Sequence, residues 1–296
     1  MQVNDMEQGK TVCQVGGKDD LCFKAGKFSF PIGRRTYIMG ILNVTPDSFS
    51  DGGKYLTMDD AMRQAEALLS AGADILDIGG ESTRPGSDPV DLETEMARVV
   101  PVVDQISRKF ACPISIDTYK SEAAEAALCA GACIINDING LQKEPGMMAI
   151  ARDHHAGIIV MHNALMYRKE NTSPAEHLLD DVITFLRKSV SMAEREGLKR
   201  DSLVIDPGIG FGITSDESID MIAQLSKLSV LNLPILVGPS RKRFIGQILD
   251  APVTARLFGT AAAVAISIAN GADIVRVHDV REIHDVVRVS DAICRH

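Results

Sequence analysis

Acidic and amide side chains follow several short apolar runs of this chain. Asp117, Asn136 and Asp206 each stand at the end of a segment rich in Ile and Val. Their oxygen atoms could accept paired hydrogen bonds from a planar ligand with adjacent N–H groups. Taken singly, a residue of this kind could equally cap the following helix. Because polar residues end eight such runs, the pattern favours one shared binding site.

A second set of polar residues is cationic. The residues that could together hold an anionic group are Arg84, Lys242, Arg276 and His278. Backbone N–H groups at the helix start that follows Ser240 could assist them. Arg276 stands between two valines, so its charge should point inward and require a partner such as a ligand anion. Arg241 and Arg243 could instead lie on a solvated helix face.

Two polar segments rich in Gly, Ser and Pro follow the first and second apolar runs. They cover residues 44–54 and 80–88, and their composition excludes regular structure. Their length and their place beside the polar run ends favour loops that fold over a ligand. Ordinary surface loops are the alternative.

The apolar runs are short, continuous and rich in Ile, Val and Leu, as in strands that are covered on both faces. Three of them follow a helix that ends at Gly72, Gly131 or Gly271, where glycine can adopt the left-handed conformation of a helix end. Helix starts are expected at Thr57 and Ser173. The eight runs cover residues 36–43, 75–78, 113–117, 134–137, 157–162, 202–207, 234–238 and 274–277.

Eight strands that alternate with helices predict a single α/β domain, a (β/α)8 TIM barrel, in which the strand ends carrying the polar residues meet on one face. An open doubly wound sheet is the alternative, but no G-x-G-x-x-G follows the first strand. The domain should span residues 20–296. It should begin with a β-hairpin at residues 20–35, and residues 1–19 are polar and expected to be disordered.

The composition excludes some classes of partner. A formal charge of −9 argues against a nucleic-acid ligand, which requires a basic face. No run reaches the roughly 18 apolar residues of a membrane span, and the N-terminus lacks a targeting pattern. The six cysteines show no zinc-ligand spacing and are expected to be reduced thiols. We therefore expect a cytoplasmic protein without membrane or nucleic-acid partners.

Long motifs in these same regions resemble the dihydropteroate synthases, which are pterin-binding enzymes. The two longest are MGILNVTPDSFSDGG at 39–53 and GADILDIGGESTRPGS at 72–87. Shorter motifs follow in the family's order: SIDTYK, IINDI, MH, DPGIGFG, SRKRFIG and RVHDV. The resemblance implies a transferase of folate biosynthesis. This enzyme would condense 6-hydroxymethyl-7,8-dihydropterin diphosphate with 4-aminobenzoate, release pyrophosphate and be a sulfonamide target.

The resemblance also implies roles for individual residues. The pterin would contact Asp117, Asn136, Met161, Asp206 and Lys242. The diphosphate would contact Asn43, Thr83, Arg84, Arg276 and His278, with Asn43 also contacting a Mg²⁺ ion. The 4-aminobenzoate would contact Phe49, Thr83, Pro85, Phe211, Lys242 and Arg243. The residues expected to act in catalysis are Asp51, Lys242, Arg276 and His278.

The expected reaction is substitution at the pterin methylene carbon with carbocation character. Mg²⁺, Arg276 and His278 would stabilise the departing diphosphate, and Asp51 the cationic carbon. An arylamine is neutral at pH 7, so no strong general base is needed. The family's habit suggests a homodimer through the last helices.

Two departures from the family pattern, Ile213 and Asn163, concern secondary contacts. One alternative is the methyltetrahydrofolate-binding domain of a corrinoid methyltransferase system, which should lack the diphosphate and aminobenzoate residues. A second alternative is a catalytically inactive homologue. No residue at an assigned position is a disabling one, which argues against it.

Overall fold

Eight parallel strands form the centre of the computed structural model, which describes residues 21–45, 58–81, 88–165 and 177–295. In chain order they are β3 (Tyr37–Asn43), β4 (Ile75–Gly79), β5 (Ile114–Asp117), β6 (Ile134–Asp137), β7 (Gly157–Met161), β8 (Leu203–Asp206), β9 (Leu236–Val237) and β10 (Ile274–Val277). They pair in the order β8-β7-β6-β5-β4-β3-β10-β9. A parallel bridge from Ile205 to Ile235 joins the two outer members. The sheet therefore closes into the predicted barrel, and the open-sheet alternative is wrong.

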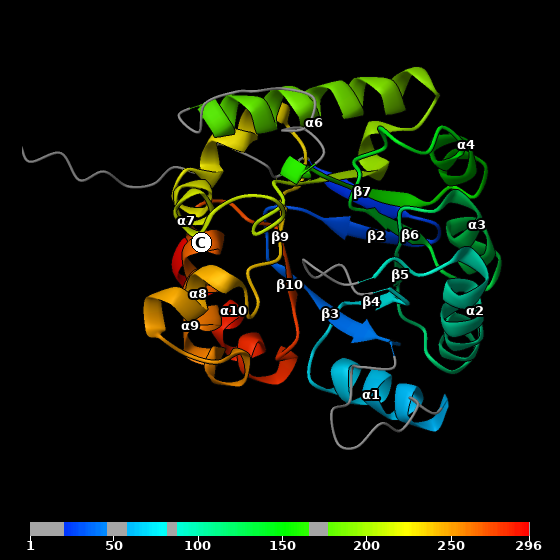
Figure 1. Cartoon of the computed structure of the whole chain (residues 1–296), viewed down its shortest axis with the longest axis horizontal. Coiled ribbons are helices and arrows are strands. Elements are labelled where there is room, and N and C mark those ends of the chain that lie inside the picture. Colours follow the sequence, from blue (N-terminus) through cyan, green and yellow to red (C-terminus); the bar gives the residue numbers. More distant parts are fainter. Residues whose placement is uncertain (1–20, 46–57, 82–87, 166–176, 296) are drawn as a thin grey trace, which may run out of the picture.

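Helices connect successive strands and surround the barrel (Figure 1). They are α1 (Met58–Ser70), α2 (Leu92–Lys109), α3 (Ser121–Cys129), α4 (Gly146–Asp153), α6 (Leu178–Arg195), α7 (Ser215–Ala223), α8 (Arg243–Leu249), α9 (Leu257–Ala269) and α10 (Val280–Cys294). Short 3-10 turns occur at η3 (Arg200–Ser202), η4 (Leu225–Leu231) and η5 (Val253–Ala255). No helix within these described ranges is long and apolar enough to cross a membrane.

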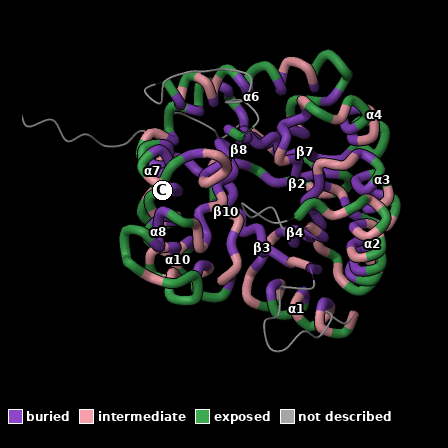
Figure 2. The backbone as a smooth tube through the Cα atoms, viewed as in Figure 1, coloured by how far each residue is buried: buried purple, intermediate pink, exposed green. Residues whose placement is uncertain are grey.

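The helix ends follow the sequence pattern. Gly72, Gly131 and Gly271 have φ values of +104°, +115° and +97°, so each adopts the predicted left-handed conformation. The apolar stripes of α1 and α6 face inward, and the strands between the helices are buried (Figure 2). The expected N-caps Thr57 and Ser173, like residues 1–20, lie outside the described residues.

A two-stranded hairpin, β1 (Cys22–Ala25) and β2 (Phe28–Pro31), confirms the predicted N-terminal extension. Its Phe23 and Phe30 pack against the first residues of the barrel strands, including Ile75 and Ile134. A side chain at Gly157 would meet the Phe23 ring. The hairpin therefore fills the amino-terminal end of the barrel with apolar side chains, and any ligand must enter from the opposite, carboxyl-terminal end.

A buried ion-pair network joins the turns that follow β4 and β5. The Nζ atom of Lys120 lies 2.6 Å from a carboxylate oxygen of Glu81 and also contacts Glu95, whose side chain is 1% exposed. Burial alone would lower the pKa of Lys120, but the two carboxylates outweigh it and raise that pKa. This network fixes the chain just after Asp117.

Replacing Lys120 by methionine should lower the free energy of unfolding by about 3 kcal/mol, because Glu95 would keep a buried charge without its partner. Urea denaturation measures this loss. Lys109 is the matched control, because it pairs with Glu66 at the surface: the Lys109 side chain is 51% exposed and that of Glu66 57%. Lys109→Met should cost less than about 1 kcal/mol. Equal losses in the two variants would contradict the role of the Lys120 network.

Candidate active site

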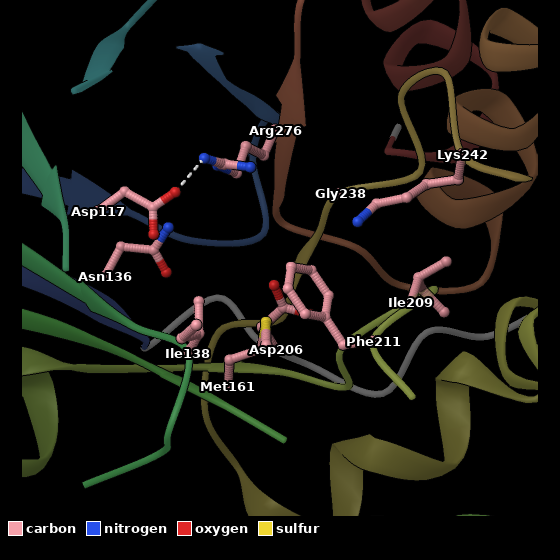
Figure 3. Close-up of a pocket in the computed structure, with 10 residues that line it drawn as sticks. All are labelled: Asp117, Asn136, Ile138, Met161, Asp206, Ile209, Phe211, Gly238, Lys242 and Arg276. Atoms are coloured by element: carbon pink, nitrogen blue, oxygen red, sulfur yellow. Dashed lines mark hydrogen bonds and ion pairs between the residues drawn. The ribbon is translucent and has the colours of Figure 1, made fainter. Parts of the chain in front are cut away.

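The carboxyl-terminal ends of the strands surround one pocket (Figure 3). Seven of the predicted site residues line it, together with Ile138, Ile209 and Gly238; the seven are Asp117, Asn136, Met161, Asp206, Phe211, Lys242 and Arg276. Lys242 reaches it from the segment after β9. Residues that are far apart in the sequence therefore meet at one mouth, as the strand pattern predicted.

Arg276 holds two carboxylates at the centre of the pocket. Its Nε atom donates to Asp77 at 2.6 Å, and its Nη2 atom donates to Asp117 at 2.6 Å. The Asp77 side chain is fully buried and that of Arg276 is 17% exposed. Burial alone would lower the pKa of Arg276, but the two carboxylates outweigh it and raise that pKa. The guanidinium group is thus permanently charged and fixed in orientation.

Asp77 is a residue of this site to which the sequence analysis gave no role. A polar residue in this place could equally cap the following helix. The available signal was its place between Leu76 and Ile78, which matches the place of Arg276 between two valines. Two opposite charges that both point into one barrel should pair.

The acceptor atoms for a planar ligand lie beside this ion pair. The Oδ1 atom of Asp117 is buried and has no hydrogen-bond partner within the described part of the chain. The Asp206 carboxylate accepts the backbone N–H of Gly208 at 2.7 Å through its Oδ1 atom. Asn136 donates to Asp77 over a long 3.4 Å. Buried oxygen atoms with this spare capacity are suited to a ligand that carries N–H groups.

Burial changes the charge of these acceptors. It raises the pKa of Asp117 to about 7, although Arg276 acts in the opposite direction. It likewise raises the pKa of Asp206 to about 6, opposed by the bond from Gly208. Both carboxyl groups should therefore lose a proton readily when a ligand offers hydrogen-bond donors to the ionised form.

Lys242 points into the pocket from the side opposite Asp117 and Asn136 (Figure 3). Its Nζ atom is 4.1 Å from the centre of the Phe211 ring, which is a cation–π contact. Burial and then the nearby charge of Arg276 lower the pKa of Lys242 to about 8. The lysine and the phenyl ring together form the apolar and cationic side of the pocket.

His278 and Arg243 lie at the margin of the site. The Nδ1 atom of His278 is 3.0 Å from the Ser240 hydroxyl, which also accepts the His278 backbone N–H at 3.2 Å. Arg243, the first residue of α8, has an exposed side chain. Neither side chain lines the pocket itself.

Asn43 ends β3 at the same mouth. A Cβ atom placed on Gly79 would lie 3.8 Å from the amide oxygen of Asn43 and 3.7 Å from a carboxylate oxygen of Asp117. The two oxygens thus border one space, and such oxygens are the ligands that Mg²⁺ prefers. The described residues include no group of three or more His, Cys, Asp or Glu side chains that could hold a metal ion. A Mg²⁺ ion here would need ligand atoms from a bound substrate.

The predicted residues of the two polar loops, Phe49, Asp51, Thr83, Arg84 and Pro85, lie outside the described residues. Both departures from the family pattern have structural contacts. Ile213 is 6% exposed within the main apolar core. The side-chain oxygen of Asn163 accepts the backbone N–H of Leu165 at 3.2 Å. Neither residue lines the pocket.

The sequence matches the family model of pterin binding enzymes over residues 39–278. It is similar to the dihydropteroate synthase of Bacillus subtilis, with 46% identity over 88% of this chain and 89% of the relative. The dihydropteroate synthase of Synechocystis is 44% identical, over 91% of this chain and 94% of the relative. The methyltetrahydrofolate alternative is not favoured by these relatives.

Solved structures of the same enzyme agree in fold. A Clostridium difficile dihydropteroate synthase with pteroic acid has a TM-score of 0.85 at 43% identity, covering 90% of this chain and all of its own. A Xanthomonas albilineans dihydropteroate synthase with 4-aminobenzoic acid has a TM-score of 0.81 at 39% identity, over 88% and 93% of the chains. With its barrel, its acidic pocket and these relatives, the chain belongs to the pterin binding enzymes and, within them, to the dihydropteroate synthases.

Proposed function

We propose that this protein condenses 6-hydroxymethyl-7,8-dihydropterin diphosphate with 4-aminobenzoate, giving 7,8-dihydropteroate and pyrophosphate. As a dihydropteroate synthase it is a transferase. The group that it transfers to the amine is the dihydropterin together with its methylene carbon, which places the reaction among alkyl or aryl transfers. The observation that carries the proposal is the pocket, where spare acceptors on Asp117 and Asp206 face Lys242 across a space that Met161 and Phe211 border. The relatives solved with 4-aminobenzoic acid and with 7,8-dihydropteroate support it.

Each side of the pocket has a distinct task in this reaction. Asp117, Asn136 and Asp206 bind the N–H groups of the pterin edge, and Met161 packs on its ring. The C–O bond to the diphosphate breaks, the C–N bond to the amine forms, and the amine nitrogen then loses one proton to solvent. Arg276 and His278 stabilise the departing negative charge. Fixed cationic groups contribute most where charge develops, so Arg276 is the central residue of this step.

Pyrophosphate release provides the test. The protein should release pyrophosphate when pterin diphosphate and 4-aminobenzoate are supplied together, and much less with either alone. A sulfonamide should compete with 4-aminobenzoate and leave pterin binding unchanged. Release that does not depend on the amine would show hydrolysis and would overturn the proposed condensation.

The proposed site also includes a Mg²⁺ ion on the diphosphate, held by Asn43. When bound, the ion neutralises charge on the leaving group. Excess EDTA should lower turnover at least tenfold, and added Mg²⁺ should restore it. Asn43→Ala should raise the Mg²⁺ concentration needed for half-maximal turnover. Binding of 6-hydroxymethylpterin, which lacks the diphosphate, is the control and should not respond to EDTA; full turnover in EDTA would remove the ion from the proposal.

A homodimer through the last helices is part of the same proposal. Helices α9 and α10 pack together and expose large apolar side chains: Phe258 at 86%, Ile266 at 52%, Val289 at 61% and Ile293 at 66%. Sedimentation should detect a dimer, and Phe258→Asp should weaken it because a charge would be buried at the interface. Val230 on η4 is 62% exposed, and Val230→Asp is the control that should remain dimeric. A wild-type monomer would contradict the proposal.

A cytoplasmic location completes the proposal. The five described cysteines are free thiols, a state that a reducing compartment preserves. Fractionation of the source cells with an antibody against this chain would test the location.

A further inference from the structure

The segment that carries Lys242 to the pocket contains an uncommon backbone conformation. Arg241, the residue before Lys242, has a φ value of +57°, which places a residue with a side chain in the left-handed region. Such a conformation persists only where the surroundings fix it, and it is concentrated at functional sites. The contacts that fix Arg241 therefore also determine where Lys242 points.

Two neighbouring elements hold Arg241 itself. Its backbone N–H donates to the hydroxyl of Thr260 at 3.0 Å, and Thr260 on α9 is fully buried. Its guanidinium group pairs with both carboxylate oxygens of Asp279, one of them at 3.0 Å from Nε. The backbone and the side chain of Arg241 are thus both held, by α9 and by the residue that precedes α10.

Arg256 holds the carbonyl groups on either side of Lys242. Its Nη1 atom donates to the backbone oxygen of Arg241 at 3.0 Å and to that of Lys242 at 3.4 Å. Its Nε atom donates to the oxygen of Ala251 at 3.0 Å. A Cβ atom on Gly246 would overlap the guanidinium group, so the glycine leaves the space that Arg256 occupies. The guanidinium group of Arg256 thus connects the two carbonyl groups beside Lys242 to that of Ala251, which follows α8.

We infer that Arg256 is a positioning residue for the reaction, acting through Lys242. By fixing the peptide groups on both sides of Lys242, it directs the lysine side chain from the loop toward Phe211 and the pocket (Figure 3). Arg256 does not line the pocket, so its effect on substrate passes through Lys242. The inference rests on the proposed function, in which Lys242 contacts the pterin.

A double-mutant cycle with Lys242→Ala tests the inference. The affinity for 6-hydroxymethylpterin is measured by its fluorescence in the full-length wild type, R256A, K242A and the double variant. Arg256→Ala should weaken binding about tenfold where Lys242 is present and less than about twofold where it is absent, because residues that act as one unit are not additive. An equal loss in both backgrounds would overturn the inference, since a general structural effect does not depend on Lys242.

Arg200→Ala is the matched control. Arg200 also binds a backbone carbonyl group, that of Leu231, and pairs with Glu194, but it lies before β8 at the opposite end of the barrel. Its loss should lower the unfolding temperature and leave pterin affinity unchanged. Where R256A does not fold, Arg256→Lys, which keeps the charge but lacks the planar fork that binds the three carbonyl groups, enters the same cycle under the same criterion.

The two proposals fail in different ways. A wild-type protein that releases no pyrophosphate from the two substrates contradicts the proposed function. A wild-type protein that releases it, combined with an additive cycle, contradicts only the role of Arg256.

Discussion

Replacing Arg276 by methionine should remove measurable turnover and lower the free energy of unfolding by about 3–5 kcal/mol. Methionine keeps much of the side-chain volume but removes the guanidinium group that Asp77 and Asp117 share. Asp77 is fully buried and would lose its charged partner. Asp117 can take up a proton, because burial raises its pKa to about 7, and this limits its share of the cost. Urea denaturation and pyrophosphate release measure the two effects.

A second variant separates stability from catalysis. In R276M/D77N, no full charge remains at position 77, so part of the lost unfolding free energy should return. Turnover should stay absent, because the cation that stabilises the departing diphosphate is still missing. If R276M were as stable as the wild type, the described ion pair would be wrong. If the double variant regained turnover, Arg276 would have no catalytic role.

The order of strands and helices could be predicted because each element has a local sequence pattern. Helix-ending glycines and β-branched runs recur along the chain, and each run became a strand. Closure of the barrel depends on the bridge between Ile205 and Ile235, which no local pattern in the sequence encodes. The number of repeats decided in favour of the barrel, and the structure agrees.

The polar strand ends were not all alike. Asp117 and Asp206 line the pocket, whereas Asp137 accepts the backbone N–H groups of Asn139 and Leu141 and so caps its own turn. The His162 ring packs edge to face against the Phe185 ring, with 5.0 Å between the ring centres, and it is not part of the pocket lining. The three aspartates are the same residue type, and all four residues lie at the end of a strand or directly after it. Only the direction of the side chain distinguishes the functional role from the local one, and that direction depends on tertiary packing.

Arg256 illustrates a second limit of sequence reasoning. Its partners are backbone carbonyl groups, which every residue possesses, so nothing in the pattern of residue types indicates the contact. Gly246 leaves the space that Arg256 occupies, but a glycine inside a short helix has several explanations and does not identify the contact. Contacts to charged side chains, such as Asp77 with Arg276, are easier to infer because both members are unusual in buried strands.

The affinity for the pterin should depend on pH through the buried carboxyl groups. Burial raises the pKa of Asp206 to about 6, so the free protein holds a proton there below this pH. The bound pterin donates N–H groups and favours the ionised form. The contribution of Asp206 to the affinity should therefore be full above about pH 7 and fall about tenfold per pH unit below pH 6. Fluorescence titration of 6-hydroxymethylpterin between pH 5 and 8 measures this, and calorimetry in two buffers measures the released protons.

The stability of the ligand-free protein should change in the opposite direction. Between the ordinary pKa of 3.8 and the raised value of about 6, the folded state holds more protons at Asp206 than the unfolded state, so stability falls as pH rises through this window. Asp206→Asn should remove this contribution and weaken pterin binding at pH 7.5 by about 2–4 kcal/mol, because a charged hydrogen bond is lost. The pH dependence of pterin affinity that remains in this variant should then follow Asp117, because burial raises its pKa to about 7. Pterin affinity that is constant from pH 5 to 8 in the wild type would mean that neither carboxyl group changes its charge on binding.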